Sequence, residues 1–154
     1  MIKHKKIVCK TEENTRFLAK MVAKAAKKRD VFALFGTLGA GKSTFSRYFI
    51  EHLSGATEIP SPTFTLVQTY DAPDFEIYHY DMYRLKSPEE AYELDIEEAF
   101  YNGVSLIEWP EKIGSLLPKD IWKITITTQG TQRVFDIETF GAEKSQRLEE
   151  IFVE

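Results

Sequence analysis

The sequence Val31-Phe-Ala-Leu-Phe-Gly36-Thr-Leu-Gly39-Ala-Gly41-Lys42-Ser43-Thr44 decides the fold class of this chain. Five apolar residues lead into a segment with the spacing G-x-x-x-x-G-K-S, and an amphipathic segment follows it. Glycines let the backbone adopt positive φ angles and approach a ligand closely, so that backbone N–H groups can surround a phosphate. The pattern therefore predicts a strand, a phosphate-binding loop and a helix whose N-terminus faces the phosphate.

This spacing also assigns roles to single residues. Lys42 is expected to reach the β- and γ-phosphates of a nucleotide, and the Ser43 hydroxyl to occupy one position on Mg²⁺. The alternative is a glycine-rich turn that binds nothing, but the flanking strand and helix are the context that a phosphate loop requires. The predicted nucleotide-binding residues of the loop are Gly36, Thr37, Leu38, Gly39, Ala40, Gly41, Lys42, Ser43 and Thr44.

Length and composition limit what kind of protein this is. A chain of 154 residues with 43% hydrophobic and 13% aromatic residues predicts one folded domain over residues 1–154. The single cysteine, Cys9, excludes an internal disulfide and a cysteine metal cluster. No apolar run approaches the ~20 residues of a membrane span. We therefore expect a soluble, cytoplasmic protein that does not enter a membrane.

The net charge of −4 conceals an uneven distribution. Residues 1–29 contain ten Lys or Arg against two Glu, whereas the remaining chain is strongly acidic. A basic end of this kind can meet RNA or an acidic partner. The simpler interpretation is a set of solvated lysines near a helix C-terminus, where cations are favourable.

Strands and helices are predicted to alternate early in the chain, with a hairpin late. Helices are expected at residues 12–28, 42–53, 87–100 and 142–153, the first capped by Thr11 and the third by Ser87. Strands are expected at residues 5–10, 31–35, 64–70, 75–81, 104–109, 121–128 and 133–140. This order predicts an α/β fold in three layers, with a parallel core sheet and antiparallel edge strands.

Two acidic residues directly follow predicted apolar strands. Asp81 ends Phe-Glu-Ile-Tyr-His-Tyr-Asp, and Glu108 ends Val-Ser-Leu-Ile-Glu. Phosphate-loop chemistry needs such a carboxylate on Mg²⁺, and ligands in these sheets lie beyond the carboxyl ends of the strands. Either acid could instead cap a helix or pair with Arg84. We predict Ser43, Asp81 and Glu108 as metal ligands, and Lys42, Asp81 and Glu108 as catalytic residues.

The remaining polar residues give weaker signals. Ser61 and Thr63 belong to a proline turn that could reach the metal or the γ-phosphate, or could simply enter a strand. For Arg84 a salt bridge with a nearby acid is favoured over a role in phosphate transfer. His79 alternates with Ile77 and Asp81 along a strand and is expected to be packed in the core.

Four blocks together resemble one known family. They are Gly36-Thr-Leu-Gly-Ala-Gly-Lys-Ser-Thr-Phe45, Ser61-Pro-Thr-Phe-Thr-Leu-Val67, Tyr78-His-Tyr-Asp-Met-Tyr-Arg-Leu85 and Leu106-Ile-Glu-Trp-Pro-Glu111. In this order and at these separations they resemble the TsaE (YjeE) family of small bacterial P-loop ATPases. Those proteins act in the synthesis of threonylcarbamoyladenosine (t6A) in tRNA. The phosphate loop is common to many families, whereas the other three blocks make the resemblance specific.

The resemblance implies a P-loop NTPase-like fold and Mg²⁺-dependent ATP hydrolysis, weak alone and stimulated within a complex with TsaB and TsaD. TsaD transfers the threonylcarbamoyl group to adenosine 37, so tRNA is met only through the complex. The family's positions at the metal correspond to Asp81 and Glu108, and its switch-like loop to Thr63. The family's amino-terminal Ser/Thr-Glu segment, which lies near the base of the nucleotide, corresponds to Thr11. The family's late Gly-x-Arg region corresponds to Arg133.

The chain also departs from the family pattern, and other functions remain open. The family usually has aspartate at Thr37 and threonine at Ser43; serine keeps the hydroxyl that binds the metal. A P-loop small-molecule kinase would need an arginine-rich lid, and no arginine cluster follows the core. A GTP-dependent switch would need an Asn-Lys-x-Asp motif, which the sequence lacks. A regulatory module that binds nucleotide without turnover is the other alternative.

Overall fold

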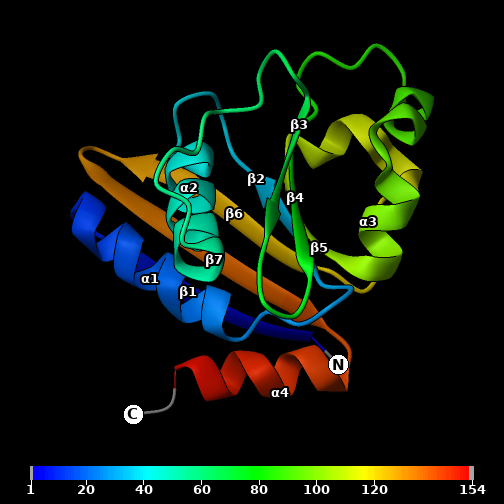
Figure 1. Ribbon diagram of the computed structural model, residues 1–154. Coiled ribbons are helices and arrows are strands. Elements are labelled where there is room, and N and C mark those ends of the chain that lie inside the picture. Colours follow the sequence, from blue (N-terminus) through cyan, green and yellow to red (C-terminus); the bar gives the residue numbers. More distant parts are fainter. Residues whose placement is uncertain (1, 153–154) are drawn as a thin grey trace.

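The computed structural model describes residues 2–152 and contains one seven-stranded sheet (Figure 1). The strand order is β1-β7-β6-β2-β5-β4-β3. The strands are β1 (Ile2–Cys9), β2 (Val31–Phe35), β3 (Val67–Asp71), β4 (Glu76–Asp81), β5 (Gly103–Glu108), β6 (Trp122–Gln129) and β7 (Gln132–Phe140). Strands β4, β5, β2 and β6 are parallel neighbours, whereas β1, β7 and β3 pair antiparallel. The predicted parallel core with antiparallel edges is confirmed.

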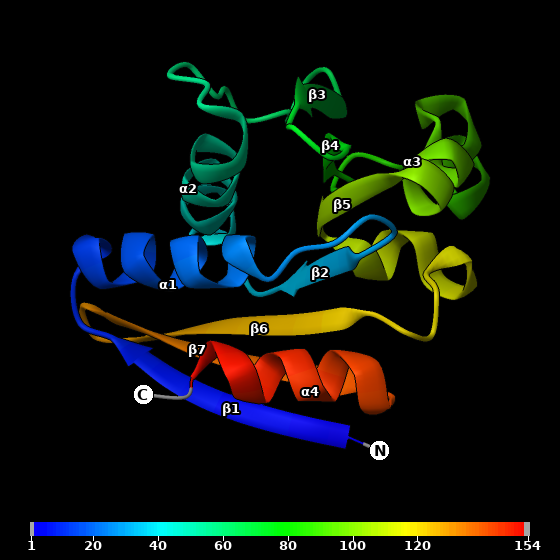
Figure 2. The ribbon, with the colours of Figure 1, turned by 60° about the horizontal axis from the view of Figure 1, so that its bottom comes forward.

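Helical segments cover both faces of this sheet (Figure 2). On one face lie α1 (Glu12–Lys24), α2 (Lys42–Ser54) and α4 (Ala142–Ile151). On the other lie α3 (Ile96–Asn102) and two 3₁₀ segments, η1 (Pro88–Leu94) and η2 (Pro110–Leu116). Each face buries its own apolar cluster, which gives the three layers that the alternation of strands and helices predicted.

Strand β2 shows how the sequence builds both clusters. Side chains alternate between the faces of a strand, and in a sheet covered on both sides all of them must be apolar. Phe32 and Leu34 belong to the cluster under α1 and α2, whereas Val31 and Ala33 belong to the opposite one. The ring of Phe32 lies 5.4 Å from Trp122 of β6, in a stacked arrangement. The continuous apolar run before the glycine-rich loop thus marks a strand in the middle of the sheet.

Tertiary contacts move several element boundaries away from the sequence prediction. Helix α1 ends at Lys24 and not at residue 28; at its C-cap, the carbonyl of Ala25 accepts a hydrogen bond of 2.7 Å from Arg147 of α4. The predicted helix 87–100 is broken at Asp95, which adopts φ 57°. The hydroxyl of Tyr80 donates to the carbonyl of Leu94 there, at 2.8 Å.

Other boundaries shift for local reasons. Strand β3 begins at Val67 and not at residue 64, because the N–H of Leu66 closes a turn onto the carbonyl of Pro62 at 2.7 Å. The η2 segment, which begins at Pro110, was not predicted. Helix α4 ends at Ile151; Val153, where the sequence placed its end, lies outside the described residues. None of the helices within residues 2–152 is both long and apolar enough to cross a bilayer.

A buried ion pair joins the last helix to the core. Arg147 of α4 is 6% exposed and donates from both Nη atoms to the carboxylate of Asp30, at 2.6 and 2.8 Å. Its Nε and Nη2 atoms donate to Glu143, at 2.7 and 2.8 Å. The guanidinium also lies 5.3 Å from the ring centre of Trp122. Asp30 directly precedes β2, so this pair ties α4 to the strand that carries the glycine-rich loop.

Removing Asp30 should destabilise the protein strongly. The substitution Asp30→Ala leaves the buried guanidinium of Arg147 without its buried partner, and we expect a loss of about 3–5 kcal/mol in the free energy of unfolding. Glu143 is mostly exposed, so Glu143→Ala serves as the matched control and should cost about 1 kcal/mol or less. Urea denaturation of both variants measures the difference. Equal losses would contradict the proposed role of the buried pair.

Candidate functional site

The glycine-rich loop joins the end of β2 to the start of α2. Gly36, Gly39 and Gly41 have φ angles of 156°, 80° and 113°, values that side-chain-bearing residues rarely adopt. A Cβ atom at Gly36 would lie 2.8 Å from the carbonyl oxygen of Ile126 in β6. Gly41 is the N-cap of α2 and provides no side-chain cap. The first N–H groups of α2 are therefore open to an anion, which the helix dipole also attracts.

Lys42 is almost completely buried behind this loop. Its exposed fraction is 5%, and its Nζ donates to the carbonyl of Gly36 and, at 3.2 Å, to that of Thr37. The ammonium also lies 3.8 Å from the ring centre of Trp109, a cation–π contact. Burial lowers the pKa of Lys42, while the nearby carboxylates, Glu108 first among them, act in the opposite direction. The ammonium thus sits between the loop and the acidic residues.

The two predicted acidic residues come together at the carboxyl ends of neighbouring strands. In the parallel pair β4–β5, Asp81 is directly opposite Glu108, and in the pair β2–β5, Leu34 is opposite Glu108. Asp81 is 7% exposed and Glu108 is 3% exposed. The hydroxyl of Ser43 donates to Oε1 of Glu108 at 2.9 Å, which links the first turn of α2 to the end of β5.

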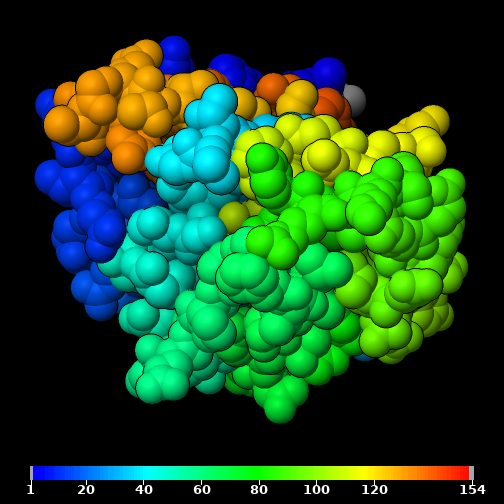
Figure 3. Space-filling model, turned by 90° about the horizontal axis from the view of Figure 1, so that it is seen from above, coloured from blue at the N-terminus to red at the C-terminus, as the bar shows by residue number. Residues whose placement is uncertain are grey.

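The Ser61–Thr63 turn lies on the same side of the molecule. Thr63 donates to Oδ2 of Asp81 at 3.3 Å, and the hydroxyls of Ser61 and Thr63 are 2.9 Å apart. Seen from above, the loop segment near residue 40 (cyan) lies between the β6–β7 turn (orange) and the chain around residues 60–85 (green) (Figure 3). A hollow of about 230 Å³ is lined by Leu38, Gly39, Ala40, Gly41, Lys42, Ser43, Thr44, Ser61, Thr63, Asp81, Glu108 and Trp109.

A second hollow of about 230 Å³ lies on the other side of the loop. It contains the two nucleotide-binding residues assigned by resemblance alone, Thr11 before α1 and Arg133 in β7. Gly39, Gly41 and Thr44 line both hollows, so the two adjoin the same loop. The structure therefore brings Thr11 and Arg133 next to the phosphate loop, although they are far apart in the sequence.

Two residues near the site had been assigned no function. His79 of β4 is 1% exposed, as a packed residue should be, but its Nε2 lies 2.6 Å from Oε2 of Glu108. Trp109 adopts φ 58°, and its ring contacts both Lys42 and, at 4.8 Å between ring centres, Tyr83. For His79 the signal in the sequence was its position two residues before Asp81, on the same side of the strand.

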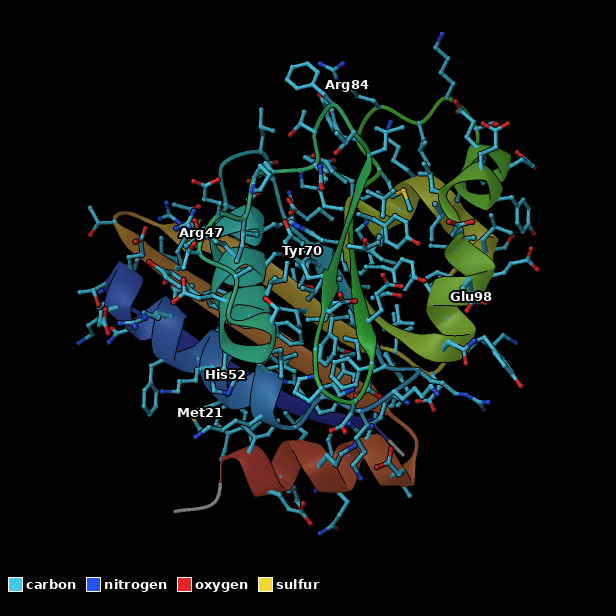
Figure 4. The ribbon with its side chains drawn as sticks, in the orientation of Figure 1. Met21, Arg47, His52, Tyr70, Arg84 and Glu98 are labelled. Atoms are coloured by element: carbon cyan, nitrogen blue, oxygen red, sulfur yellow. The ribbon has the colours of Figure 1, made fainter. Side chains whose placement is uncertain are left out.

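The expectation for Arg84 was wrong. Among residues 2–152 it forms no salt bridge with an acid; its guanidinium lies 4.4 Å from the ring centre of Phe64. Figure 4 shows Arg84 at the outer end of the loop after β4, directed away from the sheet. Neither Asp81 nor Glu108 is neutralised by it, and both remain directed at the hollow beside the loop.

The donor set fits a hard divalent cation. Mg²⁺ prefers oxygen ligands and is usually bound by one or two carboxylates together with substrate phosphates and water. Ser43, Glu108 and Asp81 provide one hydroxyl and two carboxylates along the same hollow. No cluster of three or more His, Cys, Asp or Glu side chains suited to a metal occurs among residues 2–152.

Comparisons with known proteins agree with this architecture. The sequence model of the family "Threonylcarbamoyl adenosine biosynthesis protein TsaE" matches residues 9–135. A tRNA threonylcarbamoyladenosine biosynthesis protein TsaE from Rickettsia felis is 45% identical over 141 residues, which cover 90% of this chain and 82% of the relative. The protein of the same name from Bacillus subtilis is 40% identical over 119 residues, 77% of this chain and 74% of the relative.

A solved structure is similar over almost the whole chain. The crystal structure of Bacillus subtilis YdiB matches with a TM-score of 0.78 and 33% sequence identity. The match covers 98% of this chain and 95% of that one. The three-layer arrangement with its edge strands is therefore shared with an experimentally determined structure.

Substitution of two loop glycines should have unequal effects on stability. Gly36→Ala forces both an unfavourable φ and an overlap with the Ile126 carbonyl, so we expect a loss of about 2–4 kcal/mol in the free energy of unfolding. Gly39→Ala has open space around its Cβ and should cost only about 1–2 kcal/mol, from its positive φ. Chemical denaturation compares the two variants. A larger loss for Gly39→Ala would refute this description of the loop.

Proposed function

The chain belongs to the TsaE family of threonylcarbamoyl adenosine biosynthesis proteins, and from this we propose that it hydrolyses ATP in support of t6A synthesis in tRNA. One observation supports the proposal most directly. The hydroxyl of Ser43, in the phosphate loop, donates to the buried carboxylate of Glu108, and Asp81 lies directly opposite Glu108 on the next strand. A helix N-terminus, a lysine and two carboxylates thus face one hollow.

The reaction would be the attack of water on the γ-phosphorus of ATP, which breaks the bond to the β–γ bridging oxygen and releases ADP and phosphate. The backbone N–H groups of residues 36–44 hold the phosphates, and the Lys42 ammonium stabilises negative charge on the transferred group. Ser43, Glu108 and Asp81 would hold Mg²⁺. When bound, the metal neutralises charge on the β- and γ-phosphates.

The hollow that contains Thr11 and Arg133 is the proposed site for the adenosine part of ATP. It lies beside Gly41 and Thr44, where the α-phosphate end of a nucleotide would leave the loop. The nearest Arg133 atom, Nε, is 3.8 Å from the position that a Cβ at Gly41 would take. The hollow is also lined by the hydroxyl-bearing residues Thr15, Thr44 and Thr131, which suit a ribose.

Exposed apolar side chains near the site support action within a complex. Leu38, at the tip of the phosphate loop, is 78% exposed, and Phe64, next to the Thr63 switch position, is 79% exposed. Contiguous apolar patches mark surfaces that partners cover, and in this proposal Leu38 and Phe64 contribute to such a patch. We propose that TsaB and TsaD are these partners, that tRNA is met through them, and that the complex acts in the cytoplasm.

ATP hydrolysis by the purified protein, alone and with TsaB and TsaD, tests this proposal. We expect slow turnover alone, a clear rise with the partners, and a loss of at least about tenfold in Lys42→Ala and Glu108→Ala, which each remove a charged group from the transition state. An exposed lysine before the start of β2, at the opposite end of that strand from the loop, provides the control Lys28→Ala. If the wild-type protein binds ATP but releases no phosphate with partners present, the regulatory module without turnover is the better description.

The base site can be tested by binding alone. Arg133→Ala should weaken ATP binding by about tenfold while leaving inorganic triphosphate binding within about twofold, since a hydrogen bond from a charged group contributes about 1.5–3 kcal/mol. Arg29, before the start of β2 and so at the opposite end of that strand from the loop, provides the control Arg29→Ala. Isothermal titration calorimetry measures both ligands. An equal loss for ATP and triphosphate would place Arg133 at the phosphates and not at the nucleoside.

A further inference from the structure

His79 is a buried histidine that the proposed reaction does not use. It lies in β4 with 1% of its surface exposed, and its Nε2 is 2.6 Å from Oε2 of Glu108. A carboxylate oxygen only accepts hydrogen bonds, so Nε2 must carry the proton in this contact. The other oxygen of the same carboxylate, Oε1, accepts from Ser43 at 2.9 Å. The carboxylate of Glu108 is therefore held at both ends.

The register of the sheet places His79 diagonally next to Glu108. Asp81 of β4 is directly opposite Glu108 of β5, and His79 is opposite Leu106. Alternate residues of a strand share a face, so His79 and Asp81 lie on the same side of the sheet. His79 thus reaches Glu108 diagonally from the interior side, whereas Asp81 approaches from the side of the hollow.

Packing alone does not account for a histidine at this position. Its second ring nitrogen, Nδ1, is buried and has no hydrogen-bond partner. Burying a polar atom without a partner costs free energy, and an apolar side chain would avoid that cost. The compensating contact is the one with Glu108, because it satisfies a buried carboxylate oxygen that would otherwise also lack a partner.

We propose that His79 is a positioning residue that holds the Glu108 carboxylate with Oε1 directed at Ser43, and that it thereby sets the affinity of the site for Mg²⁺. The hydrogen bond restricts rotation of the carboxylate, so that one oxygen stays at the hollow. Residues that orient metal-binding groups in this way typically change metal affinity by 10–100-fold when they are removed. The inference rests on the function proposed above, since it concerns the same two residues, Ser43 and Glu108.

The test measures binding of a non-hydrolysable ATP analogue with and without Mg²⁺. The ratio of the two dissociation constants gives the Mg²⁺-dependent gain in affinity for each variant. His79→Leu and His79→Met remove the N–H donor, and His79→Gln retains an N–H donor of similar reach. Ser105→Ala is the matched control: Ser105 is also fully buried in the adjoining strand, and its hydroxyl has no partner, so the substitution leaves Glu108 untouched.

We expect the Mg²⁺-dependent gain to fall by about 10–100-fold in His79→Leu and His79→Met. Affinity for the analogue without Mg²⁺ should stay within about twofold of the wild-type value, because the loop and Lys42 are unchanged. His79→Gln should recover most of the gain, and Ser105→Ala should retain all of it. Thermal unfolding, measured in parallel, shows which variants are folded, and only these enter the comparison. Two apolar replacements are made because either of them, if folded, is enough for the test.

A purely structural histidine would give a different result. The apolar variants would then lose stability while keeping the wild-type Mg²⁺-dependent gain, or His79→Gln would fail to restore it, and either outcome overturns the inference. A wild-type protein that binds the analogue without any gain from Mg²⁺ would instead overturn the proposed metal site itself. The two failures are distinguishable, because the first appears only in the variants and the second already in the wild type.

Discussion

The parallel pairing of β5 between β2 and β4 determines where the chemistry of this chain is placed. Three neighbouring parallel strands end at the same edge of the sheet, and each brings one part of the site to that edge. Strand β2 leads into the glycine-rich loop, β4 ends in Asp81 and β5 ends in Glu108. The register of the pairs places the two carboxylates directly opposite each other. A register shift of one residue would turn one of them to the other face of the sheet.

Several groups in the site are held in costly states. Trp109 adopts φ 58° and ψ 49°, a left-handed conformation that costs about 1–3 kcal/mol in a residue with a bulky side chain. Burial lowers the pKa of Lys42, which means that the folded state disfavours its charged form. His79 keeps one ring nitrogen without a partner. Strain of this kind is common at functional sites, and the surrounding structure must compensate for it.

The aromatic core beneath α2 provides part of this compensation. Phe45 and Phe49 of α2 are fully buried and lie against Phe135 and Phe32 of the sheet, with ring centres 5.6 and 5.0 Å apart. These contacts fix the helix whose N-terminus forms part of the proposed phosphate site. At the other end of β2, the Asp30–Arg147 pair anchors α4 to the start of the same strand. The strand that leads into the loop is thus secured at both ends.

The sequence by itself determined the central strand, the glycine-rich loop and the two strand-terminal carboxylates, because each depends on local spacing, and the order of the elements determined the three-layer class of fold. A strand buried on both faces must be apolar throughout, and a loop that surrounds phosphate must contain glycine. Such constraints act within a few residues and can be read directly. Helix α1 was predicted too long and the break at Asp95 was not predicted, since propensity and capping signals within one segment do not reveal contacts with distant residues.

Only the tertiary structure decided which distant residues meet. Arg147 of α4 binds the carbonyl of Ala25 at the end of α1, and Arg84 lies over an aromatic ring instead of an acid. The contact between His79 and Glu108 depends on the register of β4 against β5. No spacing within one segment specifies a register between two strands that are far apart in the sequence, because it is fixed by how both strands pack against the rest of the fold.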